Sequence, residues 1–216
     1  MKSKRIVILG ANSAARIVAY NLSYAQDAEV AGFVDPDSSR WGTNLSGKPI
    51  FGGDDRLPGL REQGVTHAVI AAGDPHTRSK LRQLLATVGI ELANAIHPSV
   101  TISPAVVLGK GVVILAGSVL SDNPVIGDNV WIGLAAVITH DTSIGNDSLI
   151  GGSCAIGADV QIGERTVIGW GSVVGPRRKV GSDSAVGFGS NVVYDIPSSV
   201  VAVGNPAKVI KHRSGR

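Results

Sequence analysis

The sequence predicts a two-domain chain: an α/β domain with a small parallel, Rossmann-like sheet over residues 1–95, then a parallel β-helix over residues 96–216. The main observation is an aliphatic residue at every sixth position from Ile96 to Val192, without exception. A period of six fits neither an α-helix nor a single strand, and is typical of a hexapeptide solenoid. The second observation is the alternation of strand and helix patterns before residue 96, which favours a parallel sheet.

The hexads also carry small residues at fixed places. Glycine often follows the aliphatic residue directly, as at Gly127 and Gly157, and a small residue often follows four positions after it, as at Ser148 and Cys154. Small residues are expected at corners, where the backbone turns tightly. In the triangular solenoids that this pattern resembles, three hexads form a coil of about eighteen residues, so the run predicts between about five and six coils.

The N-terminal domain is expected to begin with a strand at 5–10, a helix at 13–24 and a second strand at 29–35. A short helix at 54–63, broken by Pro58-Gly59, precedes a strand at 65–73, a helix at 77–88 and a last strand at 90–96. Ligands of parallel sheets bind beyond the carboxyl ends of the strands. We therefore expect one crevice formed by Gly10, Asn12, Ser13, Ala14, Asp35 and Gly73.

Two interpretations of this crevice remain open. The turn from Gly10 to Ala15 lacks the G-x-G-x-x-G pattern, which argues against a dinucleotide dehydrogenase. A helix N-terminus still offers N–H groups to a phosphate, and Asp35 can accept a hydrogen bond from a ribose or a base. Alternatively, Asn12 and Ser13 are an ordinary helix cap on a purely structural sheet.

His140 and Asp141 are the candidate catalytic pair. Most hexads contain nothing reactive, and this pair is the exception in the solenoid. A neutral imidazole is a good general base near neutral pH, and a neighbouring carboxylate raises its basicity and fixes its tautomer. The alternative is a surface histidine that happens to precede an aspartate.

Several classes of protein are disfavoured. The net charge of +3 is scattered and accompanied by only 4% aromatic residues, which gives no pattern for nucleic-acid binding. Apolar runs are too short for a bilayer, no signal peptide is recognisable, and the single cysteine excludes an intrachain disulfide, so a cytoplasmic protein is expected. No metal site is expected, since the solenoid contains only His97 and His140 as histidine ligands before the tail.

These features, together with the segment Gly204-Asn205-Pro206-Ala207-Lys208, resemble the hexapeptide acyltransferases. More narrowly, the chain is similar to the bacterial UDP-4-amino-sugar N-acetyltransferases and the related sialic-acid O-acetyltransferases. The stretch from Ile138 to Gly145 matches the active-site stretch of that family. The resemblance implies a left-handed β-helix, a homotrimer, acetyl-CoA in a groove between subunits, and a nucleotide sugar held by the N-terminal domain.

The resemblance also implies residue roles. His140 is the general base for direct acetyl transfer, and Asp141 orients it. Trp170 and Phe188 border the pantetheine in one interpretation and form trimer contacts in the other. The residues that the resemblance places near acetyl-CoA are Leu149, Gly152, Ala158, Trp170, Phe188 and Lys208.

The chain departs from the family pattern at three places. A loop histidine of the family is replaced within Ser13-Ala14-Ala15, an asparagine seven residues before the catalytic histidine is Gly133 here, and a histidine on the acetyl-CoA side falls on Leu149. The function expected is N-acetylation of a UDP-linked 4-amino-sugar. Two alternatives remain open: O-acetylation of a sugar or sialic acid, and a non-catalytic trimeric scaffold.

Overall fold

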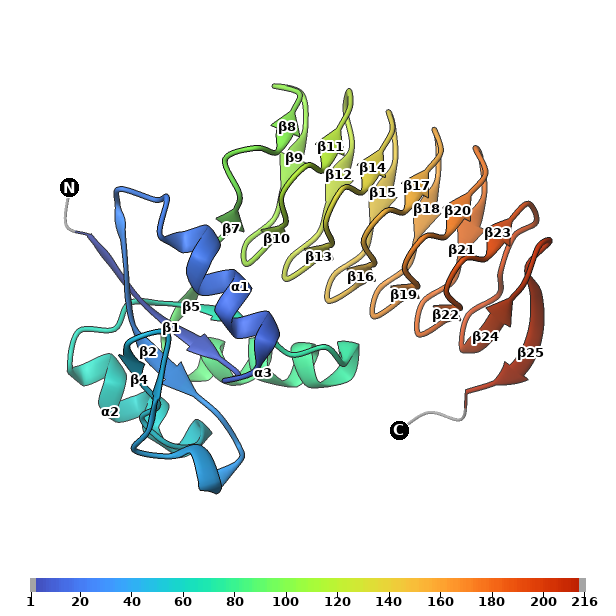
Figure 1. Cartoon of the computed structure of the whole chain (residues 1–216). Coiled ribbons are helices and arrows are strands. Elements are labelled where there is room, and N and C mark those ends of the chain that lie inside the picture. Colours follow the sequence, from blue (N-terminus) through green and yellow to red (C-terminus); the bar gives the residue numbers. More distant parts are fainter. Residues whose placement is uncertain (1–2, 214–216) are drawn as a thin grey trace. The chain divides into compact units, whose positions relative to one another are not determined.

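The computed structural model describes residues 3–213 (Figure 1). The chain divides into two compact units, Met1–Pro98 and Ser99–Arg216. This division lies a few residues beyond the domain boundary expected from the sequence. Each unit has its own hydrophobic core.

The first unit contains a parallel sheet with the strand order β2-β1-β5-β6. Its strands are β1 (Lys4–Leu9), β2 (Ala28–Val34), β5 (His67–Ile70) and β6 (Glu91–Leu92). Its helices are α1 (Ser13–Leu22), α2 (Leu57–Glu62), α3 (Pro75–Thr87) and the 3-10 helices η1 (Ser38–Arg40) and η2 (Asp54–Arg56). Short strands β3 (Asn44–Leu45), β4 (Lys48–Pro49) and β7 (Ala95–Ile96) complete the unit.

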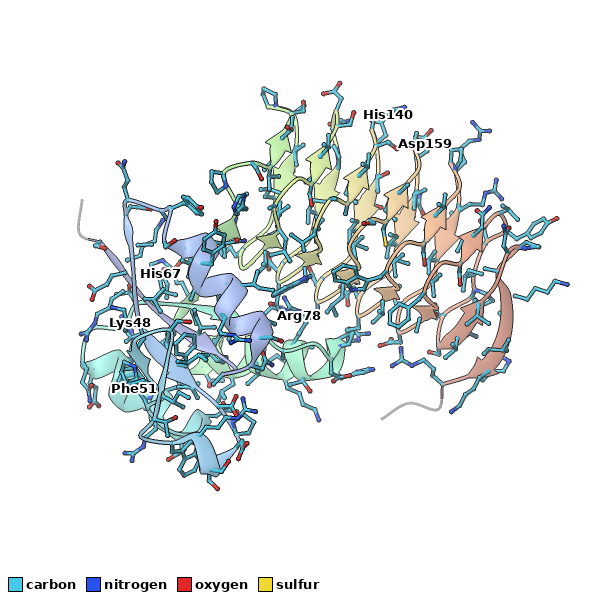
Figure 2. The ribbon with its side chains drawn as sticks, in the orientation of Figure 1. Lys48, Phe51, His67, Arg78, His140 and Asp159 are labelled. Atoms are coloured by element: carbon cyan, nitrogen blue, oxygen red, sulfur yellow. The ribbon has the colours of Figure 1, made fainter. Side chains whose placement is uncertain are left out.

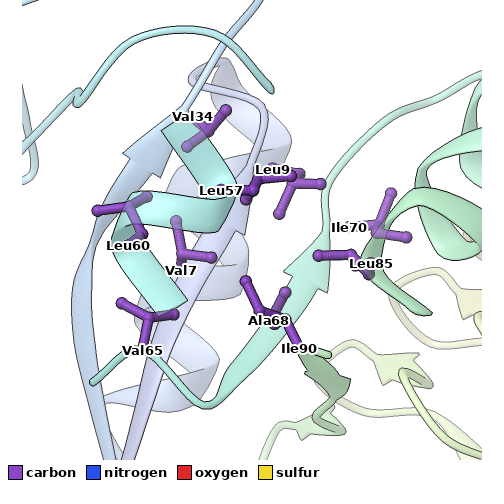
Figure 3. Close-up of a cluster of buried hydrophobic side chains, with 10 residues drawn as sticks. All are labelled: Val7, Leu9, Val34, Leu57, Leu60, Val65, Ala68, Ile70, Leu85 and Ile90. Carbon is purple, nitrogen blue, oxygen red and sulfur yellow. The ribbon is translucent and has the colours of Figure 1, made fainter. Parts of the chain in front are cut away.

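One face of this sheet packs against α2 and α3. Alternate residues of β1, such as Val7 and Leu9, point into a cluster that also contains Leu57, Leu60 and Leu85 from the two helices (Figure 3). All members of the cluster are at most 4% exposed. Full burial of each Val, Leu or Ile contributes roughly 1.5–3 kcal/mol, so this cluster holds β1 and β5 in register and fixes where their carboxyl ends lie.

Three details of the first unit differ from the expectation. The helix expected over 54–63 is divided just before Pro58 rather than at Pro58-Gly59: the 3-10 turn η2 ends at Arg56 and α2 begins at Leu57, with Pro58 in its first turn, where no backbone N–H is needed for helical bonding. Helix α3 begins at Pro75, before the expected start, since Asp74 caps it by accepting from the Thr77 N–H. The last strand is two strands, β6 and β7, rather than one.

The second unit is a rod with three parallel β-faces (Figure 1). The first face contains β10 (Val113–Ile114), β13 (Trp131–Ile132), β16 (Leu149–Ile150), β19 (Val167–Ile168), β22 (Ala185–Val186) and β24 (Val200–Val203), with β25 (Lys208–His212) antiparallel at its end. The second contains β8 (Thr101–Ile102), β11 (Val119–Leu120), β14 (Val137–Ile138), β17 (Ala155–Ile156), β20 (Val173–Val174) and β23 (Asn191–Val192). The third contains β9 (Val107–Leu108), β12 (Val125–Ile126), β15 (Ser143–Ile144), β18 (Gln161–Ile162) and β21 (Lys179–Val180).

The aliphatic residues of the hexads line the inside of the rod. Each strand pairs with the strand one coil later, as Leu120 pairs with Ile138 and Ile138 with Ile156. Every sixth residue from Ile114 to Val192 is at most 3% exposed. The prediction of a β-helix with about eighteen residues per coil is confirmed, and the fold is a left-handed β-helix.

The glycines that directly follow the aliphatic residues are required for a different reason from the tight corners that the sequence suggested. They lie beside the backbone of the following coil: a Cβ at Gly145 would stand 2.5 Å from the Glu164 nitrogen. The tight corners are formed later in the hexad by residues with positive φ, some of them other glycines, such as Gly117 and Gly171, and many of them polar, such as Asn129, Asp147 and Asp159. Asparagine and aspartate tolerate this left-handed conformation better than most residues.

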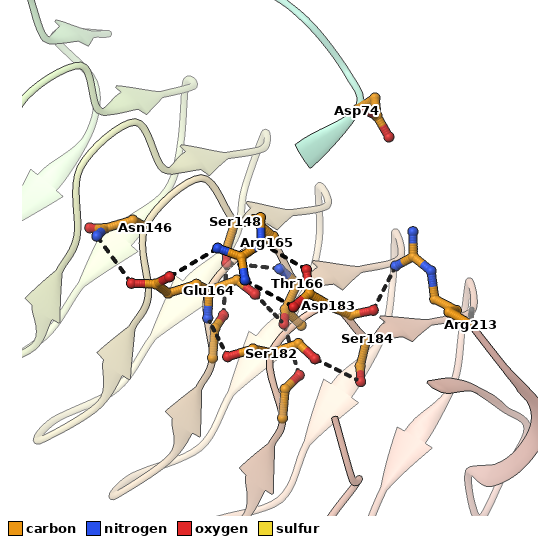
Figure 4. A network of polar contacts seen from close by, with 12 residues as sticks. Asp74, Asn146, Ser148, Glu164, Arg165, Thr166, Ser182, Asp183, Ser184 and Arg213 are labelled. Carbon is orange, nitrogen blue, oxygen red and sulfur yellow. Dashed lines mark hydrogen bonds and ion pairs between the residues drawn. The ribbon is translucent and has the colours of Figure 1, made fainter. Parts of the chain in front are cut away.

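Small residues at the other recurring position are buried and donate hydrogen bonds between coils. The Ser148 hydroxyl donates to the Gly163 carbonyl at 2.9 Å, and the Cys154 thiol to the Gly169 carbonyl at 3.1 Å. Cys154 is therefore the small core residue that its position predicts, and burial raises the pKa of its thiol. Near the C-terminal end, Arg165 donates two hydrogen bonds to Asp183 (Figure 4).

We predict that Gly145→Ala destabilises the protein by roughly 1–3 kcal/mol, the range for overpacking a close contact. The matched control is Gly59→Ala, where a Cβ meets nothing within 4 Å and a helical alanine stabilises by roughly 0.5–1 kcal/mol. Chemical denaturation of both variants measures the difference. Equal stabilities of the two variants would contradict the close approach of the coils.

Candidate functional site

His140 and Asp141 occupy the corner after β14. Asp141 adopts a positive φ of 57°, so the chain turns at this residue and both side chains project from the rod. Their exposed side-chain fractions are 54% and 47%. Figure 2 shows His140 at the outer edge of its coil, with Asp159 at the edge of the next coil.

The imidazole of His140 is held by its neighbour. Its Nδ1 lies 2.9 Å from Asp141 Oδ2. An ionised carboxylate can only accept, so this contact assigns the proton to Nδ1 and leaves the lone pair on Nε2. Within residues 3–213, Nε2 has no hydrogen-bond partner, and it is the atom that can take a proton from a ligand.

The pKa of His140 is raised above its ordinary value. The hydrogen bond to Asp141 is the largest cause, and the charges of Asp141, Asp159 and Asp122 add to it, whereas partial burial opposes it. The pKa of Asp141 is correspondingly lowered, first by its bond from Asn123 and then by its bond to His140. The pair is therefore a stronger base than a free histidine.

Asn123 is a member of this site that the sequence analysis missed. Its side-chain amide donates to Asp141 Oδ1 at 2.9 Å from one coil earlier, 18 residues before. Asp141 thus binds Asn123 with one oxygen and His140 with the other. Asn123 and Asp141 occupy the same corner of successive coils. Comparing residues 18 positions apart in the sequence would therefore have indicated this contact.

A second edge of the rod carries three of the six residues expected near acetyl-CoA. Gly152, Trp170 and Phe188 follow β16, β19 and β22, all strands of the first face. A Cβ at Gly152 would stand 2.5 Å from the Trp170 ring, so the ring lies over that glycine. Trp170 and Phe188 are 53% and 81% exposed and form an apolar ridge.

The remaining residues of that set lie elsewhere. Leu149 is half-buried on β16, Lys208 is exposed at the start of β25, and Ala158 is at the corner after β17. Ala158 shares its edge with His140, one coil later, because β14 and β17 are neighbours on the second face. One chain therefore places His140 and the Trp170–Phe188 ridge on different edges.

Gly133, which replaces a family asparagine, has a structural explanation. A Cβ there would stand 2.8 Å from the carbonyl carbon of Gly151 and the Cα of Gly152. The next coil therefore leaves no room for a side chain at this position. No asparagine can assist His140 from Gly133 without moving that coil.

The expected crevice is a cavity of about 490 Å³ in the first unit. Gly10, Asn12, Asp35 and Gly73 line it, at the carboxyl ends of β1, β2 and β5. Ser13 and Ala14 lie in the first turn of α1 and do not line it.

Asp35 is tied to the backbone of the crevice. It is 6% exposed, and its two oxygens accept the N–H groups of Ala11 at 2.5 Å and of Asp37 at 2.9 Å. Arg40 donates to the Ala11 carbonyl at 2.6 Å and lies 4.0 Å from Asp35. Asp35 therefore shapes the turn before α1. Asn12 caps α1 by accepting from the Ala15 N–H, as the structural interpretation expects.

Arg78 is a further residue that sequence reasoning missed. It is fully buried in α3, and its guanidinium donates to the carbonyls of Ile70 and Ala72 at the carboxyl end of β5. Through these two bonds it holds the end of β5 and the start of the Gly73 turn in place. A buried arginine in an otherwise amphipathic helix gives no distinctive sequence signal.

The described side chains of residues 3–213 contain no group of three His, Cys, Asp or Glu residues arranged to hold a metal ion. No helix in this part of the chain is long and apolar enough to cross a bilayer.

Known proteins resemble the chain over nearly its whole length. The PglD N-terminal domain family matches residues 5–85. PerB from Caulobacter crescentus, in complex with CoA and GDP-perosamine, is 39% identical over 95% of this chain and 97% of its own, with a TM-score of 0.90. Related structures of that perosamine N-acetyltransferase contain variants of one histidine. No curated protein matches the sequence.

A second solved structure extends the likeness. The acetyltransferase domain of PglB from Neisseria gonorrhoeae, in complex with acetyl coenzyme A, is 27% identical over 96% of this chain and 100% of that domain, with a TM-score of 0.87. WeeI from Acinetobacter baumannii, 23% identical over 95% of this chain and 99% of its own with a TM-score of 0.82, shares the fold. The chain belongs to the left-handed β-helix sugar acetyltransferases, the hexapeptide family that its sequence resembles.

We predict that Asp141→Asn lowers the pKa of His140 toward its ordinary value near 6.5, because the main cause of the upward shift is removed. Asp159→Asn is the comparison: it acts only through space and gives a smaller decrease. NMR titration of the His140 ring protons measures both. An Asp141→Asn variant with an unchanged His140 pKa would refute the coupling.

Proposed function

We propose that the chain is an acetyl-CoA-dependent N-acetyltransferase that acetylates the amino group of a nucleotide-linked 4-amino-sugar. The main observation behind this proposal is the exposed His140–Asp141 pair, in which Nε2 has no hydrogen-bond partner among residues 3–213. Supporting it is the likeness to a perosamine N-acetyltransferase over nearly the whole chain. The family resemblance favours uridine as the base, whereas PerB is in complex with a GDP-sugar.

His140 is the general base of this proposal. Its Nε2 accepts the proton that the sugar amine loses on attack, while Nδ1–H remains bonded to Asp141, which stabilises the imidazolium. Acetyl-CoA supplies the electrophile: a C–N bond forms at the thioester carbonyl carbon and the C–S bond breaks. Nε2 then returns the proton to the departing sulfur, so His140 is neutral again after each turnover.

The residues on the rod suit an acyl-CoA. Trp170 and Phe188 offer an exposed apolar ridge for the pantetheine arm, and Lys208 offers an exposed cation for phosphate groups. Leu149 lies on a strand of the same face as this ridge. In the first unit, the N-terminus of α1 at the crevice favours a diphosphate.

We propose further that the active protein is a homotrimer with its sites between subunits. The support is the separation of His140 and the Trp170–Phe188 ridge onto different edges of one chain. Cyclic symmetry brings different edges of neighbouring copies together. The second face also exposes Val119, Val137 and Val173, at 37–43%, and contiguous apolar surface of this kind marks interfaces.

We expect His140→Ala to lower kcat by about 10²–10⁴-fold, the contribution of a general base. The assay follows CoA release with acetyl-CoA and a GDP- or UDP-linked 4-amino-sugar. His212→Ala, which removes an exposed histidine on β25, is the control and keeps full activity. Turnover of His140→Ala within a few-fold of the parent would remove His140 from the role of base.

Sites shared between subunits predict complementation. His140→Ala and Trp170→Ala chains, each weakly active alone, should regain activity when refolded together, because some interfaces then combine an intact His140 edge with an intact Trp170 edge. Refolding each variant alone is the control. Mixtures no more active than the mean of the two variants would place each site within one chain.

The two alternative functions give different results in the same assays. An O-acetyltransferase would acetylate a hydroxyl sugar nucleotide faster than its amino counterpart. A non-catalytic scaffold would show no calorimetric binding of acetyl-CoA. Family membership and the likeness to an N-acetyltransferase favour the amine acceptor.

A further inference from the structure

The crevice of the first unit is rich in carboxylates, although the proposed ligand is itself an anion. Asp35, Asp54 and Asp74 all line the cavity, against one lining cation, Arg40. Carboxylates next to a diphosphate are unfavourable unless their charge is used elsewhere or faces the donor groups of the ligand. The three carboxylates differ in what they bind.

Two of them are occupied by the protein. Asp35 accepts backbone N–H groups with both oxygens. Asp74 caps α3, accepting from the Thr77 backbone N–H at 2.8 Å and from its hydroxyl at 2.9 Å. Both act mainly on the turns that form the cavity wall.

Asp54 is different. Among residues 3–213, its carboxylate has no hydrogen-bond or ion-pair partner, and it is half-buried at the start of η2. Burial raises its pKa, and the nearby charges of Asp55 and Asp35 raise it further. A partly desolvated carboxylate without donors is costly, so a ligand that brings two donors gains from meeting it.

The position of Asp54 indicates which part of a nucleotide it meets. The segment that leads to it runs along the outer side of β2: Ile50 bridges Phe33 in parallel, and the Asp35 N–H donates to the Gly52 carbonyl at 2.9 Å. Moving outward from the turn before α1, the order is β1, then β2 with Asp35, then this segment with Asp54. With phosphates at the α1 N-terminus and the ribose over β2, the base lies over the outer segment.

Trp41 fixes this segment. Its ring nitrogen donates to the Asp35 carbonyl at 2.8 Å, and a Cβ at Gly53 would stand 3.2 Å from its ring. The residue before Asp54 therefore packs on an indole that is tied to the end of β2. A carboxylate held in this way is suited to selecting between ligands.

We infer that Asp54 selects guanine as the base of the nucleotide sugar, an inference that rests on the proposed function. The guanine edge presents N1–H and N2–H side by side, which match the two oxygens of a carboxylate. Uracil presents one N–H between two carbonyl oxygens, and adenine presents an acceptor beside its amino group. Both of these place a lone pair against the carboxylate.

Calorimetry with GDP and UDP tests this on the full-length chain and two variants. The parent is expected to bind GDP at least tenfold more tightly than UDP. Asp54→Asn should weaken GDP binding by roughly tenfold to a hundredfold, the range that a bidentate base contact gives, and should leave UDP within about threefold. Asp55→Asn is the matched control: it removes an adjacent exposed charge that does not line the cavity, and should preserve the preference for GDP.

Other outcomes separate this inference from the proposed function. If Asp54→Asn weakens GDP and UDP equally, Asp54 binds the ribose and the inference is wrong. Equal binding of GDP and UDP to the parent, or an unchanged GDP affinity in Asp54→Asn, also overturns it, and the acetyltransferase proposal stands. Binding of neither nucleotide overturns the inference together with the nucleotide-sugar part of the proposed function.

Discussion

The buried column of aliphatic residues determines the register of every coil in the second unit. Each coil repeats the same inward position, and a shift of one residue would expose the whole column to water. Because the register is fixed, every residue of a hexad has a determined face or corner. The position of His140 at a corner of the rod follows from Ile138 being buried two residues earlier.

The regular repeat also brings together, at the site, residues that are far apart in the sequence. Residues one coil apart lie in contact, so Asn123 meets Asp141, and Asp122 and Asp159 flank His140 on either side. The repeat thus gathers three carboxylates around one imidazole and raises its pKa, chiefly through the hydrogen bond to Asp141, with a smaller contribution from the charges of all three. Placing these carboxylates close together costs little stability, because the side chains remain exposed to water.

The sequence predicts the rod and its candidate catalytic pair, but not all of the contacts around that pair. The period of six predicts the rod because burial of one aliphatic residue per strand leaves a signal in every hexad. His140 and Asp141 are adjacent in sequence, so their pairing needed no tertiary information. Asn123 needed the coil length, and its contact was missed.

The first unit was predicted less completely. Pro58 occupies the first turn of α2, a position that proline favours, so the division of the expected helix lies just before it. Asp35 lines the cavity, and its oxygens also hold the turn at Ala11, a contact that the sequence does not indicate. No local sequence pattern marks Asp54, because its place beside the cavity depends on the pairing of Ile50 with Phe33.

The most direct measurement of the central claim is thiol release by the purified chain with acetyl-CoA, with and without a nucleotide-linked 4-amino-sugar. The account predicts release that requires the amino sugar and rises with pH through the raised pKa of His140, and release that is absent, or independent of the sugar, would contradict it.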